Sequence, residues 1–274
     1  MLELSGLTPS QLYELNQQML NDVVPVRELI DTIASMDVLR AEYENGSASF
    51  VAQIDFLVAS GYTGIRRTRG DGDCYYRSLA FAYVERLLQE SHPAESAARA
   101  LSNLNAKLPM LDAAGFQKMV YEDFYEYLTS IIQQIITPDP STGQKLTTRI
   151  LLERFQSAEV SNSVVVFLRL LTSAQIRTDP DSYAPFLFHP ELGIQMEPRE
   201  FCESFVEAVG KEADHVQIIA LSRALEINVH IAYLDGRDTN GRVEFVEFNN
   251  APGADPLILL YRPGHYDILV KAPR

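Results

Sequence analysis

Apolar residues recur every three or four positions through much of the chain, which is the spacing of amphipathic helices. The clearest stripe ends before Pro138 and Pro140, which stop a helix because proline has no backbone N–H. Its members are Phe116, Val120, Phe124, Leu128, Ile131, Ile132 and Ile135. Similar spacing predicts further helices over residues 50–59, 150–155, 164–171 and 215–225.

The N-terminal stretch has a helical pattern of its own. Thr8 followed by Pro9 is typical of a helix start, with a capping hydroxyl and a proline in the first turn. A second helix is predicted near residues 26–35. We therefore expect a helical arm over residues 1–42, followed by one main domain over residues 43–274. The apolar positions that would share a face of the first helix are Leu12, Leu15 and Leu20.

The last quarter of the chain changes its period. Runs rich in β-branched and aromatic residues alternate with turns of Gly, Asn, Asp and Pro, which is typical of successive strands. An earlier short strand is predicted over residues 62–69. Helices first and consecutive strands last favour an α+β fold, with a small, mostly antiparallel sheet flanked by helical regions. The late runs are residues 227–234, 243–248, 257–261 and 266–270.

Composition limits the classes of function. The 274 residues are 46% hydrophobic and 22% charged, which suits a compact protein with a sizeable core. The 37 Asp and Glu against 23 Lys and Arg give a net charge of −14. That balance disfavours nucleic acid as a partner and favours a protein partner with a basic surface.

The N-terminus and the cysteines indicate the compartment. The first residues lack the basic-then-apolar pattern of a signal peptide, and no apolar run approaches the roughly 20 residues that cross a bilayer. Cys74 and Cys202 lie far apart and form neither a disulfide framework nor paired metal ligands. We expect a monomer in the cytoplasm or nucleus, with no membrane association, no cofactor and no metal.

One short segment combines a tight turn with a nucleophile. The sequence Gly-Asp-Gly-Asp-Cys at residues 70–74 stands between a predicted strand and a predicted helix. Cys74 should therefore lie near a helix N-terminus, where unpaired N–H groups and the helix dipole favour a thiolate. The turn from Asp71 through Gly72 and Asp73 can direct backbone N–H groups toward one point, as an oxyanion hole requires. Gly72 allows the positive φ that such a turn often needs.

A second segment supplies a candidate base. His265 and Asp267 lie two positions apart at the start of a predicted strand, so both side chains point to one face. A carboxylate beside an imidazole orients the ring and stabilises its protonated form. Asn249 and Asn250 are alternative orienters. Such a site forms only if folding brings distant parts of the chain together.

Each part also has a structural interpretation. A lone cysteine after a glycine-rich turn is often a structural thiol, and a His-x-Asp pair on a strand is often a surface pair. The Asp-Gly-Asp turn lacks the later ligands of a calcium loop. Cys202 has apolar neighbours and acidic flanks, which predict an inert thiol, and His230 is predicted to pack within a strand. The conjunction of the two segments favours catalysis.

The two segments resemble the motifs of otubains, a branch of the ovarian-tumour class of deubiquitinating cysteine proteases. Residues 68–77, Thr-Arg-Gly-Asp-Gly-Asp-Cys-Tyr-Tyr-Arg, are similar to the cysteine motif of that family. Residues 261–269, Tyr-Arg-Pro-Gly-His-Tyr-Asp-Ile-Leu, are similar to its longer and more specific histidine motif. Residues 212–221 are also otubain-like, and the resemblance covers roughly residues 43–271.

The resemblance implies a papain-like fold and a role for each residue. Cys74 would be the nucleophile, His265 the general base and Asp267 its orienter. The turn that begins at Asp71 would bind the oxyanion through its backbone. The substrate-binding surface would include Glu212 and His215.

The same resemblance implies the reaction and the partners. The enzyme would hydrolyse isopeptide bonds at the C-terminus of ubiquitin in polyubiquitin chains, through a thioester acyl-enzyme. Ubiquitin-conjugating enzymes would be further partners. Asp73 stands where otubains commonly have Asn, and Gly70 where they commonly have Pro. Two alternatives stay open: a regulator that binds ubiquitin and conjugating enzymes without catalysis, and a protease of another ubiquitin-like modifier.

Overall fold

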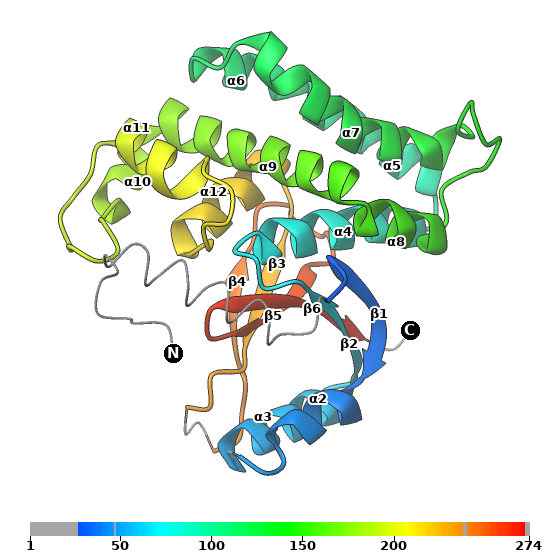
Figure 1. Cartoon of the computed structure of the whole chain (residues 1–274), viewed down its shortest axis with the longest axis vertical. Helices are drawn as coiled ribbons and strands as arrows, with labels where there is room; N and C mark the ends of the chain where they lie inside the picture. The colour runs from blue at the N-terminus through cyan, green and yellow to red at the C-terminus, as the bar shows by residue number, and fades with distance from the viewer. Residues whose placement is uncertain (1–26, 47, 238–239, 272–274) are drawn as a thin grey trace, which may run out of the picture.

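A six-stranded sheet lies at the centre of the computed structural model, which describes residues 27–46, 48–237 and 240–271 (Figure 1). Its strands are β1 (Ile30–Ser35), β2 (Tyr62–Thr68), β3 (Val229–Tyr233), β4 (Glu244–Phe248), β5 (Leu257–Arg262) and β6 (His265–Lys271). Their order across the sheet is β1-β2-β6-β5-β3-β4. Only β3 and β5 run parallel among these neighbours. The expected α+β fold with a mostly antiparallel sheet is confirmed.

Helices cover both faces of the sheet (Figure 1). The smaller layer consists of α2 (Met36–Tyr43) and α3 (Ala48–Ala59). The larger layer contains α4 (Cys74–Gln89), α5 (Pro93–Ala106), α6 (Leu108–Ala113), α7 (Lys118–Ile136), α8 (Thr148–Gln156), α9 (Ala158–Thr178), α10 (Pro180–Tyr183), α11 (Pro198–Phe201) and α12 (His215–Leu225). The predicted apolar stripe lies on α7 from Val120 to Ile135, whereas Phe116 precedes the helix. The other helices expected in the main domain are α3, α8, α9 and α12. None of the described helices is long and apolar enough to cross a membrane.

Alternation along the central strands sends side chains into two cores. On β6, Ile268 packs into the core under the larger helical layer, and the next residue, Leu269, packs into the core under α2 and α3. Leu259 and Leu260 on β5 divide in the same way. Because both faces of these strands are buried, their sequences form near-continuous apolar runs.

The helix predicted near residues 26–35 is wrong, because Ile30–Ser35 forms the edge strand β1. Ile30 pairs with Thr68 of β2 and is fully buried, and Ser35 pairs with Gly64. A short run with two isoleucines and a threonine fits both helical and strand spacing, and it forms a strand because it pairs with β2. Residues 30–35 therefore belong to the sheet. The helix expected after Thr8 lies outside the described residues, and the domain boundary at residue 42 stays a prediction.

The pairing of β2 with β6 positions the two predicted motifs. These strands run antiparallel, with Arg66 opposite Ile268. The turn that follows β2 therefore lies beside the start of β6, where His265 stands. Chain segments about 200 residues apart are thus joined by a backbone ladder.

Candidate active site

Cys74 is the first residue of α4 and follows the cysteine turn, residues 70–73. Cys74 is only 2% exposed. The N–H groups of the first helical turn have no partner within the helix, and the dipole there favours negative charge. The capping residue Asp73 has φ −101° and ψ 0°, and its side chain makes no capping hydrogen bond. Those N–H groups therefore remain available beside the sulfur.

Gly72 is the position where the cysteine turn requires glycine. Its φ is +80°, in the region that favours glycine. A Cβ at this position would lie 2.1 Å from the carbonyl oxygen of Gly210, which is far inside a contact distance. The turn therefore packs directly against the loop that precedes α12.

His265 and Asp267 form the expected pair on β6. His265 Nε2 lies 2.8 Å from Asp267 Oδ1. The same oxygen accepts the backbone N–H of Thr68 at 3.0 Å, and Oδ2 accepts from Arg262 at 2.5 Å. Asp267 is fully buried, so its charge depends on these three donors. A Cβ at Gly70 would lie 3.5 Å from His265 Nδ1, so the cysteine turn borders the other edge of the ring.

The pKa values of this pair favour its charged form. Burial alone would lower the pKa of His265, but hydrogen bonds with Asp267 and with the Cys74 sulfur, together with their charges, raise it to about 9. Burial would raise the pKa of Asp267, yet the hydrogen bond and charge of His265, the charge of Arg262 and the Thr68 N–H hold it below its usual value. A protonated imidazole next to a cysteine at a helix N-terminus can maintain a thiolate and later donate a proton.

The alternative orienters are engaged elsewhere. Asn249 contacts His230 on β3, with its Oδ1 3.2 Å from the ring Nε2. Asn250 donates to Ser222 and to the backbone of Ile227. The side chain that contacts His265 is therefore that of Asp267, and the contact of His230 with Asn249 adds a polar partner to its expected packing role.

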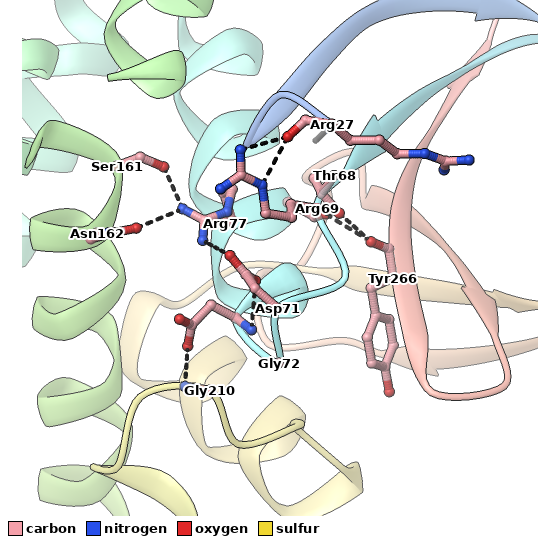
Figure 2. A network of polar contacts seen from close by, with 12 residues as sticks. Arg27, Thr68, Arg69, Asp71, Gly72, Arg77, Ser161, Asn162, Gly210 and Tyr266 are labelled. Carbon is pink, nitrogen blue, oxygen red and sulfur yellow. Dashed lines mark hydrogen bonds and ion pairs between the residues drawn. The ribbon is translucent and has the colours of Figure 1, made fainter. Parts of the chain in front are cut away.

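A buried arginine holds Asp71 (Figure 2). Asp71 Oδ1 accepts the backbone N–H of Asp73 at 3.0 Å, which closes the cysteine turn, and Oδ2 accepts from Arg77 at 2.6 Å. Arg77 also donates to Ser161 Oγ at 2.6 Å and to Asn162 Oδ1 at 3.3 Å, both on α9. The side chain of Asp71 therefore shapes the turn through these two contacts.

A second buried arginine, Arg169 on α9, binds Asp73 at 2.5 Å. Neither arginine was predicted to support the site. Arginine is mostly a surface residue, and Arg169 lies 96 positions from its partner, so a single sequence carries no signal for the pair.

A cleft of about 730 Å³ opens beside the start of β6. Glu212 and His215, which were predicted to bind substrate, both line it. His215 Nδ1 lies 3.0 Å from Asp214 Oδ1; hydrogen bonding to this carboxylate outweighs burial and raises the pKa of His215. The other residues of the wall are Pro190, Phe205, Lys211, Ala213, Asp214, Tyr233, Asp235, Arg237, Tyr261, Pro263 and Tyr266.

A family model described as Peptidase C65 Otubain matches residues 24–271. The chain belongs to the otubain family of C65 peptidases. It is 36% identical over 248 residues to the OVARIAN TUMOR DOMAIN-containing deubiquitinating enzyme 1 of Arabidopsis thaliana, which covers 86% of this chain and 78% of that protein. It is 34% identical over 248 residues to Ubiquitin thioesterase OTUB1 of Homo sapiens, which covers 89% of this chain and 83% of the human protein.

The fold of this otubain is also found in solved structures. "The structure of h/ceOTUB1-ubiquitin aldehyde-UBCH5B~Ub" matches it with a TM-score of 0.82 at 26% identity, covering 96% of this chain and 98% of that chain. A related complex with UBC13~Ub matches with a TM-score of 0.81 at 26% identity and covers 96% and 98%. The expected family, enzyme class and papain-like α+β fold are confirmed. The family model begins at residue 24, earlier than the motifs indicated, and includes β1 and α2.

The remaining candidates of this otubain have structural roles. Cys202 is fully buried, and burial raises the pKa of its thiol to about 12, so it is the inert thiol that was predicted. It opens a π-helical turn, Cys202–Val206. Within the described residues, no three His, Cys, Asp or Glu side chains gather closely enough to hold a metal ion.

Proposed function

We propose that this otubain is a deubiquitinase that hydrolyses isopeptide bonds at the C-terminus of ubiquitin, in polyubiquitin chains. The carrying observation is the 2.8 Å pair of His265 and Asp267 in contact with Cys74 at the start of α4. Family membership and the names of the relatives, deubiquitinating enzyme and ubiquitin thioesterase, support the substrate class.

The proposed chemistry follows from this geometry. The Cys74 thiolate attacks the carbonyl carbon of the terminal glycine of ubiquitin, and the C–S bond forms as the carbonyl oxygen becomes an oxyanion. The backbone N–H of Cys74 stabilises that charge, together with N–H groups of the cysteine turn other than that of Asp73, which is bonded to Asp71 Oδ1. Protonated His265 donates its proton to the departing lysine amine, and the C–N bond breaks.

The second half of the reaction releases ubiquitin. Neutral His265 takes a proton from a water molecule, which attacks the thioester carbon and expels the Cys74 thiolate. Asp267 keeps the imidazole oriented and stabilises its protonated form through both half-reactions. It does not act as the base, because three donors hold its carboxylate in the charged form.

The size and charge of the site fit the tail of ubiquitin. The nearly buried Cys74 is reached only by a thin chain, which the two terminal glycines of ubiquitin provide. That tail also carries arginines, and Glu212, Asp214 and Asp235 line the adjacent cleft. A substrate with bulky residues next to the scissile bond would not fit.

An exposed apolar surface beside the cleft fits a folded protein substrate. The hairpin around the bridge between Phe188 and Gln195 leads past Pro190, which lines the cleft. Apolar patches of this kind mark protein contacts. The exposed apolar side chains in this hairpin and directly before it are Phe186, Phe188, Leu192 and Ile194.

Capture by modifiers with a C-terminal electrophile tests this function. Ubiquitin with a C-terminal aldehyde or alkyne should attach to Cys74, and the adduct should disappear in Cys74→Ala. Other ubiquitin-like modifiers with the same electrophile serve as competitors. Attachment of another modifier in preference to ubiquitin would assign the enzyme to that modifier, and attachment of none would refute the proposed chemistry.

A second function is favoured by the solved structures, which contain ubiquitin-conjugating enzymes named UBCH5B and UBC13. We propose that this otubain also binds a ubiquitin-charged conjugating enzyme, in the cytoplasm or nucleus. The test is ubiquitin-chain synthesis with added Cys74→Ala protein, which cannot cleave chains. Inhibition of synthesis would support this role, and unchanged synthesis would exclude it.

A further inference from the structure

Arg169 on α9 contacts two other stretches of the chain, the cysteine turn and residues 206–211, through one fully buried guanidinium. Its Nε and one terminal nitrogen donate to Asp73 Oδ1 at 2.9 and 2.5 Å. It also donates to the backbone carbonyl oxygens of Gly72 at 3.1 Å, Val206 at 2.9 Å and Lys211 at 2.6 Å. All four acceptors lie in the cysteine turn or in residues 206–211. Arg169 thus ties the turn before Cys74 to the segment that leads into the cleft.

Asp73 is at the N-cap of α4, a position where aspartate usually caps the helix. As the capping residue of α4 it would normally accept an N–H of the first helical turn. In this chain it makes no such bond. Its Oδ1 instead accepts from Arg169 and from the backbone N–H of Gly210, at 3.0 Å. The carboxylate therefore points away from the N-terminus of α4. An oxyanion must bind at that N-terminus.

A carboxylate in the capping position would harm the reaction in two ways. Its negative charge would lie beside the Cys74 N–H and disfavour the oxyanion that forms there, and the same charge would disfavour a thiolate at Cys74. We propose that Arg169 is a positioning residue that holds Asp73 away from the N-terminus of α4 and clamps the cysteine turn to residues 206–211. This inference rests on the proposed thiol chemistry at Cys74.

The shape of the contact explains why the residue is arginine. A guanidinium is a planar fork that can serve several acceptors in fixed directions, whereas a lysine ammonium is a single point charge. A purely structural filler of this buried site could be apolar, because burying an ion pair is often no more stabilising than packing hydrophobic side chains. The approach of Gly72 to Gly210 shows how tightly the clamped segments meet.

Two variants, Arg169→Met and Arg169→Lys, separate the charge from the clamp. The first assay is kcat for hydrolysis of a fluorogenic amide of the ubiquitin C-terminus, which passes through an oxyanion. The second is the rate of Cys74 alkylation by iodoacetamide against pH, which reports the thiolate and needs no oxyanion hole. Cys202 does not interfere, because burial raises the pKa of its thiol to about 12.

The two variants should give different patterns. Arg169→Met frees Asp73 to cap α4, so kcat should fall by about 10²-fold, and the alkylation profile should move to higher pH. Adding Asp73→Asn to Arg169→Met removes the charge and should return the alkylation profile to that of the wild type, while kcat stays low. Arg169→Lys keeps Asp73 paired but loses the fork, so kcat should fall at least about tenfold with an unchanged alkylation profile.

A matched control is the buried ion pair of Arg66 and Glu85, at 2.9 Å. The double variant Arg66→Met with Glu85→Gln should lower Tm and leave kcat and the alkylation profile unchanged. If the Arg169 variants behave like this control, Arg169 is only structural and the inference fails. Should Arg169→Met not fold, wild-type kcat in Arg169→Lys overturns the inference by itself. A wild-type protein without hydrolytic activity would instead refute the proposed function.

Discussion

Two neighbours of His265, one from its own strand and one from a distant part of the chain, set its charge. Asp267 lies on the same strand and is itself held by Arg262 and by the backbone of Thr68. Cys74 lies at the start of α4, far from His265 in the sequence, and contributes its sulfur. An imidazole with a pKa of about 9 is protonated at neutral pH, so His265 carries a positive charge beside Cys74. Proton donation to the leaving amine is then available from the start of the reaction.

Replacing the nucleophile gives the simplest test at this scale. Cys74→Ala should lower kcat for chain cleavage by at least about 10³-fold, because the covalent route is lost. Circular dichroism and Tm should show an intact fold. Cys202→Ala is the matched control and should retain its kcat, with a lower Tm from the lost packing of a buried side chain. Retained activity in Cys74→Ala would transfer the role to another residue.

The pH dependence of hydrolysis should report His265. As pH rises through about 9, His265 loses the proton that it must donate, so kcat should decline on the alkaline side. Asp267→Asn removes the charge that helps to raise this pKa and leaves only a neutral acceptor, so the decline should begin at lower pH and the maximal rate should fall. An alkaline limb that does not move in Asp267→Asn would show that Asp267 does not act on His265.

At the scale of elements, the histidine half of the site depends on β2 and β6. β6 carries His265 and Asp267, and the last residue of β2, Thr68, binds the carboxylate. β1 covers the outer edge of β2 through its own ladder. Loss of β1 would expose that edge and loosen the strand that supports Asp267.

Truncation can separate this support from substrate binding. Deleting residues 1–37 removes β1, so Tm and both activities, on a ubiquitin electrophile and on diubiquitin, should fall together. Deleting only residues 1–26 leaves β1 in place. If residues 1–26 contact the second ubiquitin of a chain, the shorter deletion should weaken diubiquitin cleavage alone, chiefly through a higher KM. Unchanged diubiquitin kinetics would exclude that contact.

The sequence predicted long, periodic elements better than short ones. The stripe from Phe116 to Ile135 spans five turns and identified α7 without ambiguity. β1 has only 6 residues, and it is a strand because it pairs with β2. A local sequence pattern contains no information about that pairing. Local length therefore explains why α7 was right and β1 was wrong.

The same contrast holds within the candidate site. Cys74, His265 and Asp267 could be predicted as a site because each stands in a contiguous motif with a recognisable turn or strand pattern. The role of Asp73 was not found, because aspartate before a helix reads as a cap, and its true partners are Arg169 and Gly210. Only the tertiary structure brings those partners to the turn.

For the whole molecule, the net charge of −14 should act on association. An acidic enzyme attracts the basic tail of ubiquitin over distances longer than a hydrogen bond, and salt screens that attraction. We expect kcat/KM for a ubiquitin amide to fall as NaCl rises from about 20 to 500 mM, with kcat nearly constant. Glu212→Gln should reduce the salt dependence, because it removes a charge from the cleft wall. An unchanged kcat/KM over this range would show that electrostatic attraction does not assist association.

The hydrogen bond from Thr68 to Asp267 spans 199 residues. On a ribosome that adds roughly 5 to 20 residues per second, the cysteine half of the site is made about 10 to 40 s before the histidine half. During that interval the nascent chain has a thiol but no imidazole to activate it. Proteolytic competence therefore begins with the last strand, so chains abandoned before β6 would bear a nucleophile that cannot act on the ubiquitin around them.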